Sequence, residues 1–242
     1  VVALLRKEIN SFFSSLIGYL VISVFLISIG LFMWVFSDTS VLDYNFATMD
    51  QLFSIAPLVF LFLIPAVTMR SFAEEKAKGT IEFLYTKPLT SYEIILGKYL
   101  ANFSLVIFAL LPTLIYYFSI YQLGSPVGNL DSGAIFGSYI GLFFLSGAFV
   151  AIGMFASTLT NNQIIAFILG AFFCFFFHWA FVYIARMPVF AANFDLFIQK
   201  LGINYHYNSI SKGLIDSRDI VYFVSVIFVF IYATITIMEN RK

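Results

Sequence analysis

The most restrictive feature of the sequence is a run of 54 residues, Ser132 to Ala185, without a single Asp, Glu, Lys or Arg. A bilayer core about 30 Å thick is crossed by about 20 apolar residues in a helix. The run is therefore too long for one membrane span and predicts two. The uncharged polar stretch "STLTNNQ" (Ser157 to Gln163) divides it. We expect a helical hairpin with spans at approximately 133–156 and 163–185.

Four further apolar stretches have the length of a span, at approximately 16–36, 52–69, 99–120 and 220–238. The first contains no charge over 21 residues, which favours insertion by several kcal/mol. Pro57 and Pro65 lie in the second span and Pro112 in the third. Neighbouring helices must satisfy the backbone groups that these prolines leave free. The pattern predicts an all-α polytopic membrane protein with six transmembrane helices, forming one domain over residues 1–242.

Composition supports this class. The chain is 61% hydrophobic and only 11% charged, whereas soluble domains carry roughly 25% charged residues. Its formal net charge is zero, so no electrostatic argument for binding nucleic acid exists. The single cysteine, Cys174, excludes a disulfide framework and a cysteine-based zinc site. The first apolar run is too long for a cleavable signal peptide, and no small-residue cleavage site follows it.

Lys and Arg residues in the loops predict the orientation. With the N-terminus in the cytoplasm, nine of them lie inside and four outside, the four all between spans five and six. We therefore expect both termini in the cytoplasm.

Residues 3–16, "ALLRKEINSFFSSL", predict an amphipathic helix lying on the inner leaflet before span one. Apolar side chains on one face oppose polar side chains on the other: Leu5, Ile9, Phe12, Phe13 and Leu16 against Arg6, Lys7, Asn10, Ser11 and Ser14. The alternative is a simple cytoplasmic extension of span one.

The polar segment from Arg70 to Lys98 faces the cytoplasm in this topology. Gly79 and Pro88 bracket "TIEFLYTK", in which Ile81, Leu84 and Tyr85 share one face of a short helix. Thr90 and Glu93 then form a capping box for the helix that becomes span three. Such a short helix could bind a soluble partner protein and be displaced by its movement. The alternative is an ordered connector with solvated charges.

In the outer loop, a second interfacial or half-inserted helix is predicted between spans five and six. Its apolar face contains Phe190, Phe194, Phe197, Ile198 and Leu201. Asp216 and Asp219 are placed as N-cap and first-turn acid of span six.

No motif for chemistry is found. The chain has no phosphate-binding G-x-x-x-x-G-K-[ST], no H-E-x-x-H and no G-x-S-x-G pattern. We therefore predict no catalytic, cofactor-binding or metal-binding residues. His178 and His206 are too isolated to suggest a metal site, and a hydrogen bond to a neighbouring helix is the favoured role of His178 over a proton relay. Spans without carboxylates disfavour an ion-coupled secondary transporter.

Gly133, Gly137 and Gly141 form a row of small residues on span four. Such a row lets helix backbones approach closely, either within one chain or between two chains.

The stretch "EEKAKGTIEFLYTKPLTSYEIILGKYLA" resembles the ABC-2 type permeases, the membrane subunits of a class of ATP-driven transporters. The matching positions are Glu74, Glu75, Gly79, Thr80, Glu82, Thr86, Pro88, Ser91, Gly97, Lys98 and Ala101. "KGLIDSRDIVYF" (Lys212 to Phe223) is similar to the branch that includes the gliding-motility-associated permease subunits (GldF-type), and the length and six-span plan also suit that branch.

The resemblance implies a division of labour. A separate cytoplasmic ATPase dimer hydrolyses ATP, so the chain itself is not an enzyme. Its motion would reach the permease through a coupling helix between spans two and three, roughly Glu74 to Leu84, whose contact residues would be Glu74, Glu75, Gly79, Thr80, Glu82 and Leu84. The helix before span one would be the elbow helix, roughly Leu4 to Ser15, with Leu5, Arg6, Lys7, Ile9, Phe12 and Phe13.

The resemblance also implies a bacterial cytoplasmic (inner) membrane and a second permease subunit, a different chain in gliding systems. Two other functions stay open from the residues: a secondary transporter or channel, and a non-transporting membrane scaffold driven by an ATPase.

Overall fold

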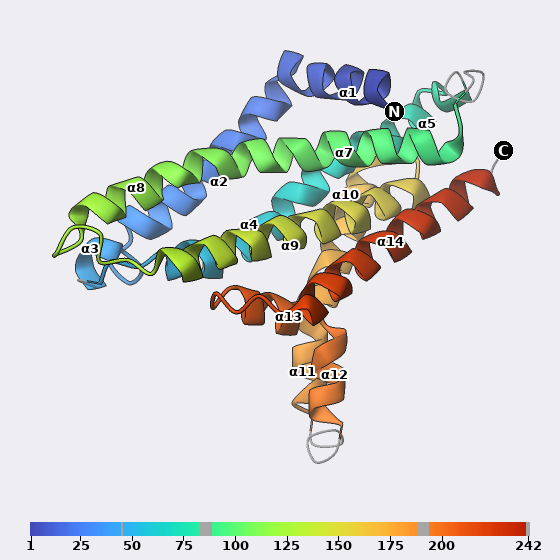
Figure 1. Cartoon of the computed structure of the whole chain (residues 1–242). Coiled ribbons are helices and arrows are strands. Elements are labelled where there is room, and N and C mark those ends of the chain that lie inside the picture. Colours follow the sequence, from blue (N-terminus) through green and yellow to red (C-terminus); the bar gives the residue numbers. More distant parts are fainter. Residues whose placement is uncertain (45, 83–88, 188–193, 241–242) are drawn as a thin grey trace.

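The computed structural model describes residues 1–242 except 45, 83–88, 188–193 and 241–242 (Figure 1). All regular structure in this described part is helical. Six helical stretches are long and apolar enough to cross a membrane: Leu16–Trp34, Asp50–Ala77, Ser91–Leu123, Ser132–Leu159, Gln163–Ala185 and Ser217–Glu239. The predicted fold class is confirmed.

The spans divide into shorter elements. Their bounds are α2 (Leu16–Trp34), α4 (Asp50–Thr68), α5 (Arg70–Ala77), α7 (Ser91–Leu110), η1 (Leu111–Thr113), α8 (Leu114–Leu123), α9 (Ser132–Leu159), α10 (Gln163–Phe175), η2 (Phe176–Ala180), α11 (Phe181–Ala185) and α14 (Ser217–Glu239). Outside the spans lie α1 (Val2–Ser14), α3 (Val41–Tyr44), α12 (Asp195–Leu201) and α13 (Ile203–Ile210).

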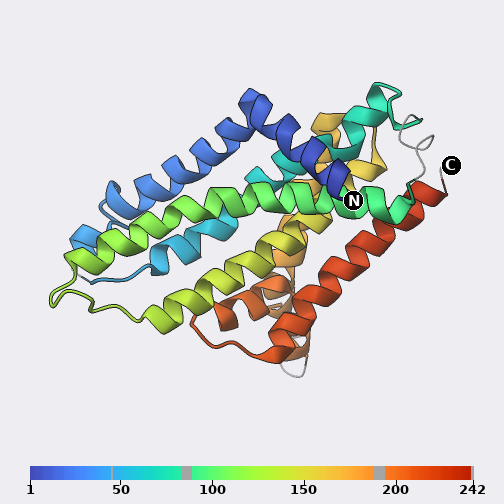
Figure 2. The ribbon, with the colours of Figure 1, turned by 45° about the horizontal axis from the view of Figure 1, so that its top comes forward.

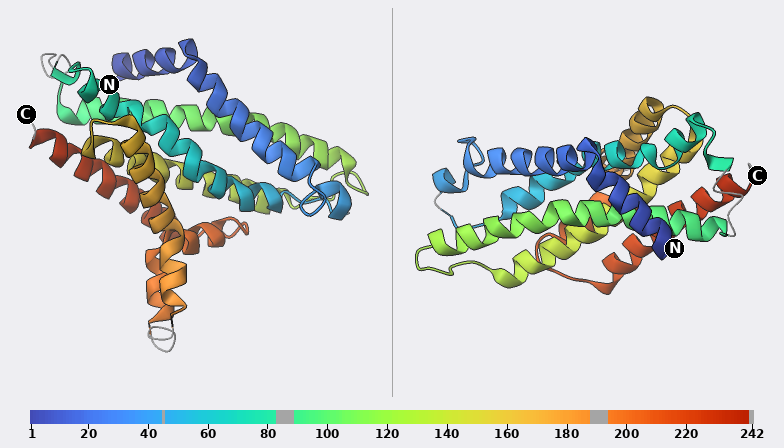
Figure 3. Two further views of the ribbon diagram at one scale, coloured as in Figure 1. Left: turned by 180° about the vertical axis from the view of Figure 1, so that it is seen from behind. Right: turned by 90° about the horizontal axis from the view of Figure 1, so that it is seen from above.

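Both ends of the described chain lie at one end of the bundle, beside α5, as Figures 1 and 3 show. We call this end the terminal face. The other end carries the α8–α9 connection and α3, and we call it the opposite face. An even number of spans returns the chain to the side from which it started, so this placement agrees with six crossings.

α1 meets α2 at an angle (Figure 2). Ser15 joins them in an extended conformation, with φ −102° and ψ 150°, which stops one helix from continuing into the other. The amphipathic face differs by one residue from the predicted one. Leu4 is buried against α7, whereas Leu5 and Ile9 are only half-buried. Leu16, predicted at the end of this helix, instead begins α2 and is 76% exposed.

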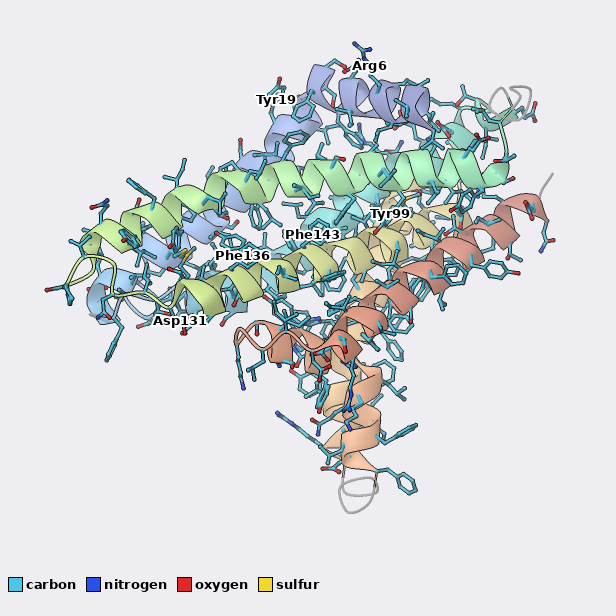
Figure 4. All side chains as sticks on the ribbon, viewed as in Figure 1. Arg6, Tyr19, Tyr99, Asp131, Phe136 and Phe143 are labelled. Carbon is cyan, nitrogen blue, oxygen red and sulfur yellow. The ribbon has the colours of Figure 1, made fainter. Side chains whose placement is uncertain are left out.

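α9 is the central helix and packs against α4, α10 and α14. Its glycine row lies against other parts of the same chain. A Cβ atom on Gly137 would be 2.9 Å from the Cα atom of Gly213, in the turn after α13, and one on Gly141 would meet Ile210. Within the described part of the chain, a Cβ on Gly133 would meet only the Asp131 side chain, at the start of α9 (Figure 4).

Pro57 explains one tie between α4 and α13. Proline has no N–H, so the carbonyl four residues earlier loses its helical donor. That carbonyl belongs to Phe53, and the buried Tyr207 hydroxyl donates to it at 2.6 Å. This is the kind of neighbouring contact that the proline pattern required. Pro112 instead lies in the 3-10 turn η1 between α7 and α8.

α11 and α12 form a hairpin that projects from the rest of the molecule (Figures 1 and 3). Phe194, Phe197 and Leu201, from the predicted interfacial helix, are 60%, 64% and 47% exposed. Phe190, predicted on the same face, lies outside the described residues. Gly202 separates α12 from α13, which turns back into the bundle.

Replacing Tyr207 with Phe tests the proline tie. The Phe53 carbonyl would be left buried without a donor, and we expect a loss of about 1–3 kcal/mol in the free energy of unfolding. Denaturant unfolding in detergent measures it. Tyr183→Phe, at an exposed position in α11, is the control. In a Pro57→Ala background the restored N–H should reduce the cost of Tyr207→Phe, and an equal cost in both backgrounds would contradict this account.

Candidate coupling surface at the terminal face

α5 continues span two beyond a single non-helical residue, Met69. Glu74 and Glu75 lie on this helix. It ends because Gly79 adopts φ +67°, a left-handed conformation that favours glycine. The N–H of Thr80 donates to the Glu75 carbonyl at 2.9 Å and that of Gly79 to Lys76 at 3.2 Å. This is a Schellman motif, which closes a helix C-terminus.

The predicted coupling helix from Glu74 to Leu84 is therefore not one helix. Its first part is the end of α5, and Gly79 and Thr80 form the turn that follows. Glu82 is exposed in a short helical piece after that turn. Leu84, and with it Tyr85, Thr86 and Pro88, lies outside the described residues.

The predicted capping box at the start of α7 is confirmed. The Glu93 N–H donates to the Thr90 hydroxyl at 3.3 Å, and the Glu93 carboxylate accepts from the Thr90 N–H at 2.9 Å. Two backbone donors at the helix start are thereby satisfied. The start of span three is well defined for this reason.

A buried lysine joins three helices at this face. Lys98 of α7 is 2% exposed, and its ammonium lies 2.8 Å from the Glu75 carboxylate of α5 and 3.3 Å from that of Glu8 in α1. The ammonium also lies 5.4 Å from the ring centre of Phe72, within the range of a cation–π contact. We call Lys98, Glu75 and Glu8 the ion cluster.

Sequence reasoning missed the ion cluster. Glu75 and Lys98 were both recognised, but as separate motif positions, and Glu8 was not singled out. The available signal was Glu8 itself, which follows Leu4 by one helical turn. Residues four apart share a helix face. That spacing places Glu8 on the side of α1 that packs against α7.

Ser157 fixes the join between α4 and α5 to the end of α9. Its hydroxyl accepts from the N–H groups of Phe72 and Ala73, both at 3.1 Å, and donates to the Met69 carbonyl at 3.0 Å. Lys76 adds a contact from its ammonium to the Thr158 carbonyl. The uncharged "STLTNNQ" stretch thus contributes its first residues to this face as hydrogen-bonding groups.

A groove of about 790 Å³ runs between α1 and the ends of α5 and α7. Charges of both signs line it: Lys7, Glu8, Arg70, Glu74, Glu75, Lys78 and Lys98. Two buried atoms there, Arg70 Nε and Glu75 Oε2, have no hydrogen-bond partner among the described residues. Arg6 lies on the other side of α1 and points away from the molecule (Figure 4).

The predicted site residues thus separate into those held in contacts inside the protein and those exposed on its surface. Glu75 is held inside the ion cluster, while Glu74 pairs with Lys78 at 2.6 Å on the surface. Phe12 packs against the core and Phe13 lies edge-on to Phe108 of α7. Arg6 and Lys7 are exposed.

At the opposite face, a second cavity of about 580 Å³ lies between α4, α9, η2 and α13. His178, in the π-helical turn η2, is 1% exposed at its base, and its Nε2 lies 3.3 Å from the Asn204 amide of α13. This is the hydrogen bond to another helix that the sequence favoured. Within the described part of the chain, no three His, Cys, Asp or Glu side chains gather to hold a metal ion.

The sequence matches the family described as "ABC-2 family transporter protein" over residues 3–238, which includes all six spans and the groove. The chain belongs to the ABC-2 transporter family. A search of the curated proteins found no match. The ABC-2 assignment makes this chain the multi-pass membrane permease of an ATP-driven transporter, and the match does not distinguish among branches of the family.

Lys98→Met tests the ion cluster of this ABC-2 permease. Two carboxylates would lose their buried counterion, and we expect a loss of about 3 kcal/mol, the lower end for a broken buried pair, because both carboxylates keep some solvent contact. Unfolding in detergent measures it. Lys7→Met, at a side chain 62% exposed, should change stability by less than about 0.5 kcal/mol. Equal losses for the two variants would show that the ion cluster contributes no more to the free energy of unfolding than an exposed lysine does.

Proposed function

We propose that this ABC-2 permease couples ATP hydrolysis by a separate cytoplasmic ATPase to export or mechanical work across a bacterial cytoplasmic membrane. The terminal face would be the docking surface. The observation that carries the proposal is the connection of α5 to four spans: it continues span two, and side-chain contacts lead from it to spans one, three and four. A displacement of α5 would therefore be transmitted through these contacts to the membrane-spanning helices.

The first route runs along span two. α5 follows α4 after one residue, and the Ser157 hydroxyl accepts from the N–H groups of Phe72 and Ala73 in α5 and donates to the Met69 carbonyl. A displacement of α5 would therefore also act on the end of span four. Well-packed helices transmit such displacements because their interfaces deform little.

The second route runs through the ion cluster. Glu75 links α5 to Lys98 near the start of span three, and Lys98 links both to Glu8 of α1. α1 leads into span one at Ser15. Spans one and three would then move with α5, since separating these charges without water is costly.

The groove supplies the complementary chemistry for a protein partner. Its lining carries charges of both signs, among them Lys7, Arg70 and Glu75, which a segment of opposite charge pattern could match. The paired Glu74 and Lys78 belong to the same lining, and Glu82 is exposed after the turn that ends α5. Interfaces that bind specifically match charge with charge and leave few buried polar groups unpaired.

Glu82→Lys should weaken association with the ATPase by about tenfold without changing the unfolding midpoint, because Glu82 is exposed. Pull-down of the ATPase by the detergent-purified permease measures it. Asp50→Lys, an exposed acid at the opposite face, is the matched control and should bind normally. Unchanged binding by Glu82→Lys would remove Glu82 from the docking surface.

Cysteine labelling tests the proposed orientation, with both termini in the cytoplasm. Thr80 and Asn129 are exposed at opposite faces of the bundle, and native Cys174 is buried. In a Cys174→Ser background, Thr80→Cys should react only with a reagent on the cytoplasmic side and Asn129→Cys only with one outside. The reverse pattern would place the terminal face outside and exclude a cytoplasmic ATPase there.

We further propose a place in the gliding-motility branch, with a different chain as the second permease. The support is the resemblance of Lys212–Phe223, which forms the turn after α13 and the start of α14. Identification of the subunits that co-purify with the chain tests it. Solute movement by the isolated chain without ATP would instead favour a secondary transporter or channel.

A further inference from the structure

A histidine and an aspartate from different helices meet where α13 packs against the start of α14. His206 Nδ1 of α13 lies 2.6 Å from Asp219 Oδ1 in the first turn of α14. His206 Nε2 lies 2.8 Å from the Lys200 carbonyl oxygen of α12. Both residues are buried, with exposed fractions of 9% and 5%. The Tyr222 ring stacks on the imidazole at 3.8 Å between ring centres.

The hydrogen-bond partners of the two His206 ring nitrogens determine how many protons the imidazole needs. A carbonyl oxygen only accepts hydrogen bonds, and so does an ionised carboxylate. A neutral imidazole has one N–H and therefore satisfies only one of these two oxygens. We propose that His206 and Asp219 form a proton-binding site, in which His206 is an imidazolium that donates from both nitrogens. The short contact to the carboxylate is the length of a charge-assisted hydrogen bond.

Among the described residues, no side chain other than His206 hydrogen-bonds to the Asp219 carboxylate. Tyr222 of α14 donates its hydroxyl to the Leu201 carbonyl at 2.7 Å, and Tyr205 meets the imidazole edge-on. Asp216, at the start of α14, accepts from the Arg218 N–H. Asp219 Oδ2 is buried without a hydrogen-bond partner in the described chain, so His206 is the group that compensates this carboxylate.

The bound proton would hold α13 in place. Loss of the proton leaves a nitrogen lone pair against an oxygen, either at Asp219 or at Lys200, and both contacts are buried. α13 forms one wall of the opposite-face cavity through Asn204 and Tyr207, and Asn204 contacts His178 there. The proton site therefore sets how firmly this cavity wall is fixed to α12 and to the start of span six. This inference does not depend on where the ATPase docks.

Nitrogen-15 NMR of the imidazoles tests the protonation state directly. The chain has only two histidines, so His178→Asn leaves His206 as a single signal set. In the full-length chain in lipid bilayers at about pH 7, both ring nitrogens of His206 should carry a proton. A neutral His206 under these conditions would overturn the proposal.

Asp219→Asn is the matched control for the effect on stability. An asparagine amide can donate to His206 Nδ1, and a neutral imidazole can then donate from Nε2 to Lys200, so both bonds form without the extra proton. The folded native site binds one proton more than a neutral imidazole and a carboxylate do. Its stabilisation is therefore present at low pH and lost as the pH rises.

We expect the unfolding midpoint of the native chain to fall by about 5 °C more than that of Asp219→Asn between about pH 6 and about pH 9. Parallel curves for the two proteins would contradict the proton site. Should Asp219→Asn not fold, protease cleavage at the α12–α13 junction of the native chain gives the second measurement. Cleavage should accelerate as the pH rises, after correction for the protease's own pH dependence, and a constant rate would contradict the proposal.

Discussion

The structure depends first on one constraint: backbone polar groups in an apolar surrounding must find partners within the protein. Helices meet this demand along the six spans, and side chains meet it where helices fail. Tyr207 supplies the donor that Pro57 lacks, and Ser157 serves three backbone groups where α4 gives way to α5. These two side chains also tie α4 to α13 and to α9. The same requirement that forms the helices thus assembles them.

Charged side chains are the second factor that determines how the helices assemble. They are few in this chain, and some of them are buried where helices meet. Two buried groupings of charged or ionisable side chains occur near the ends of helices. The ion cluster connects α1, α5 and α7 at the terminal face, and the His206–Asp219 pair connects α13 to α14 at the other. A buried charge without its partner costs several kcal/mol. Each grouping therefore specifies which helix ends belong together.

The relation between motif and structure is clearest around Gly79. The sequence predicted a break at this glycine and a capped helix from Thr90, and both are present. It also joined Glu74 to Leu84 in one coupling helix, which the left-handed glycine prevents. Glu75 was predicted as a contact for a partner, and its pairing with Lys98 was not predicted. Motif spacing along the chain carries no information about which side chain turns inward.

The sequence by itself determined the class of fold, the six spans, the capped start of α7 and the N-cap Asp216, because apolar length and local capping act over a few residues. The pairing of Lys98 with Glu8 and Glu75, of Tyr207 with Phe53, and of His206 with Asp219 was decided only by the tertiary structure. These contacts join residues that packing alone brings together. Helix periodicity predicts that a face is buried, but the partner of that face depends on how the other helices pack around α9.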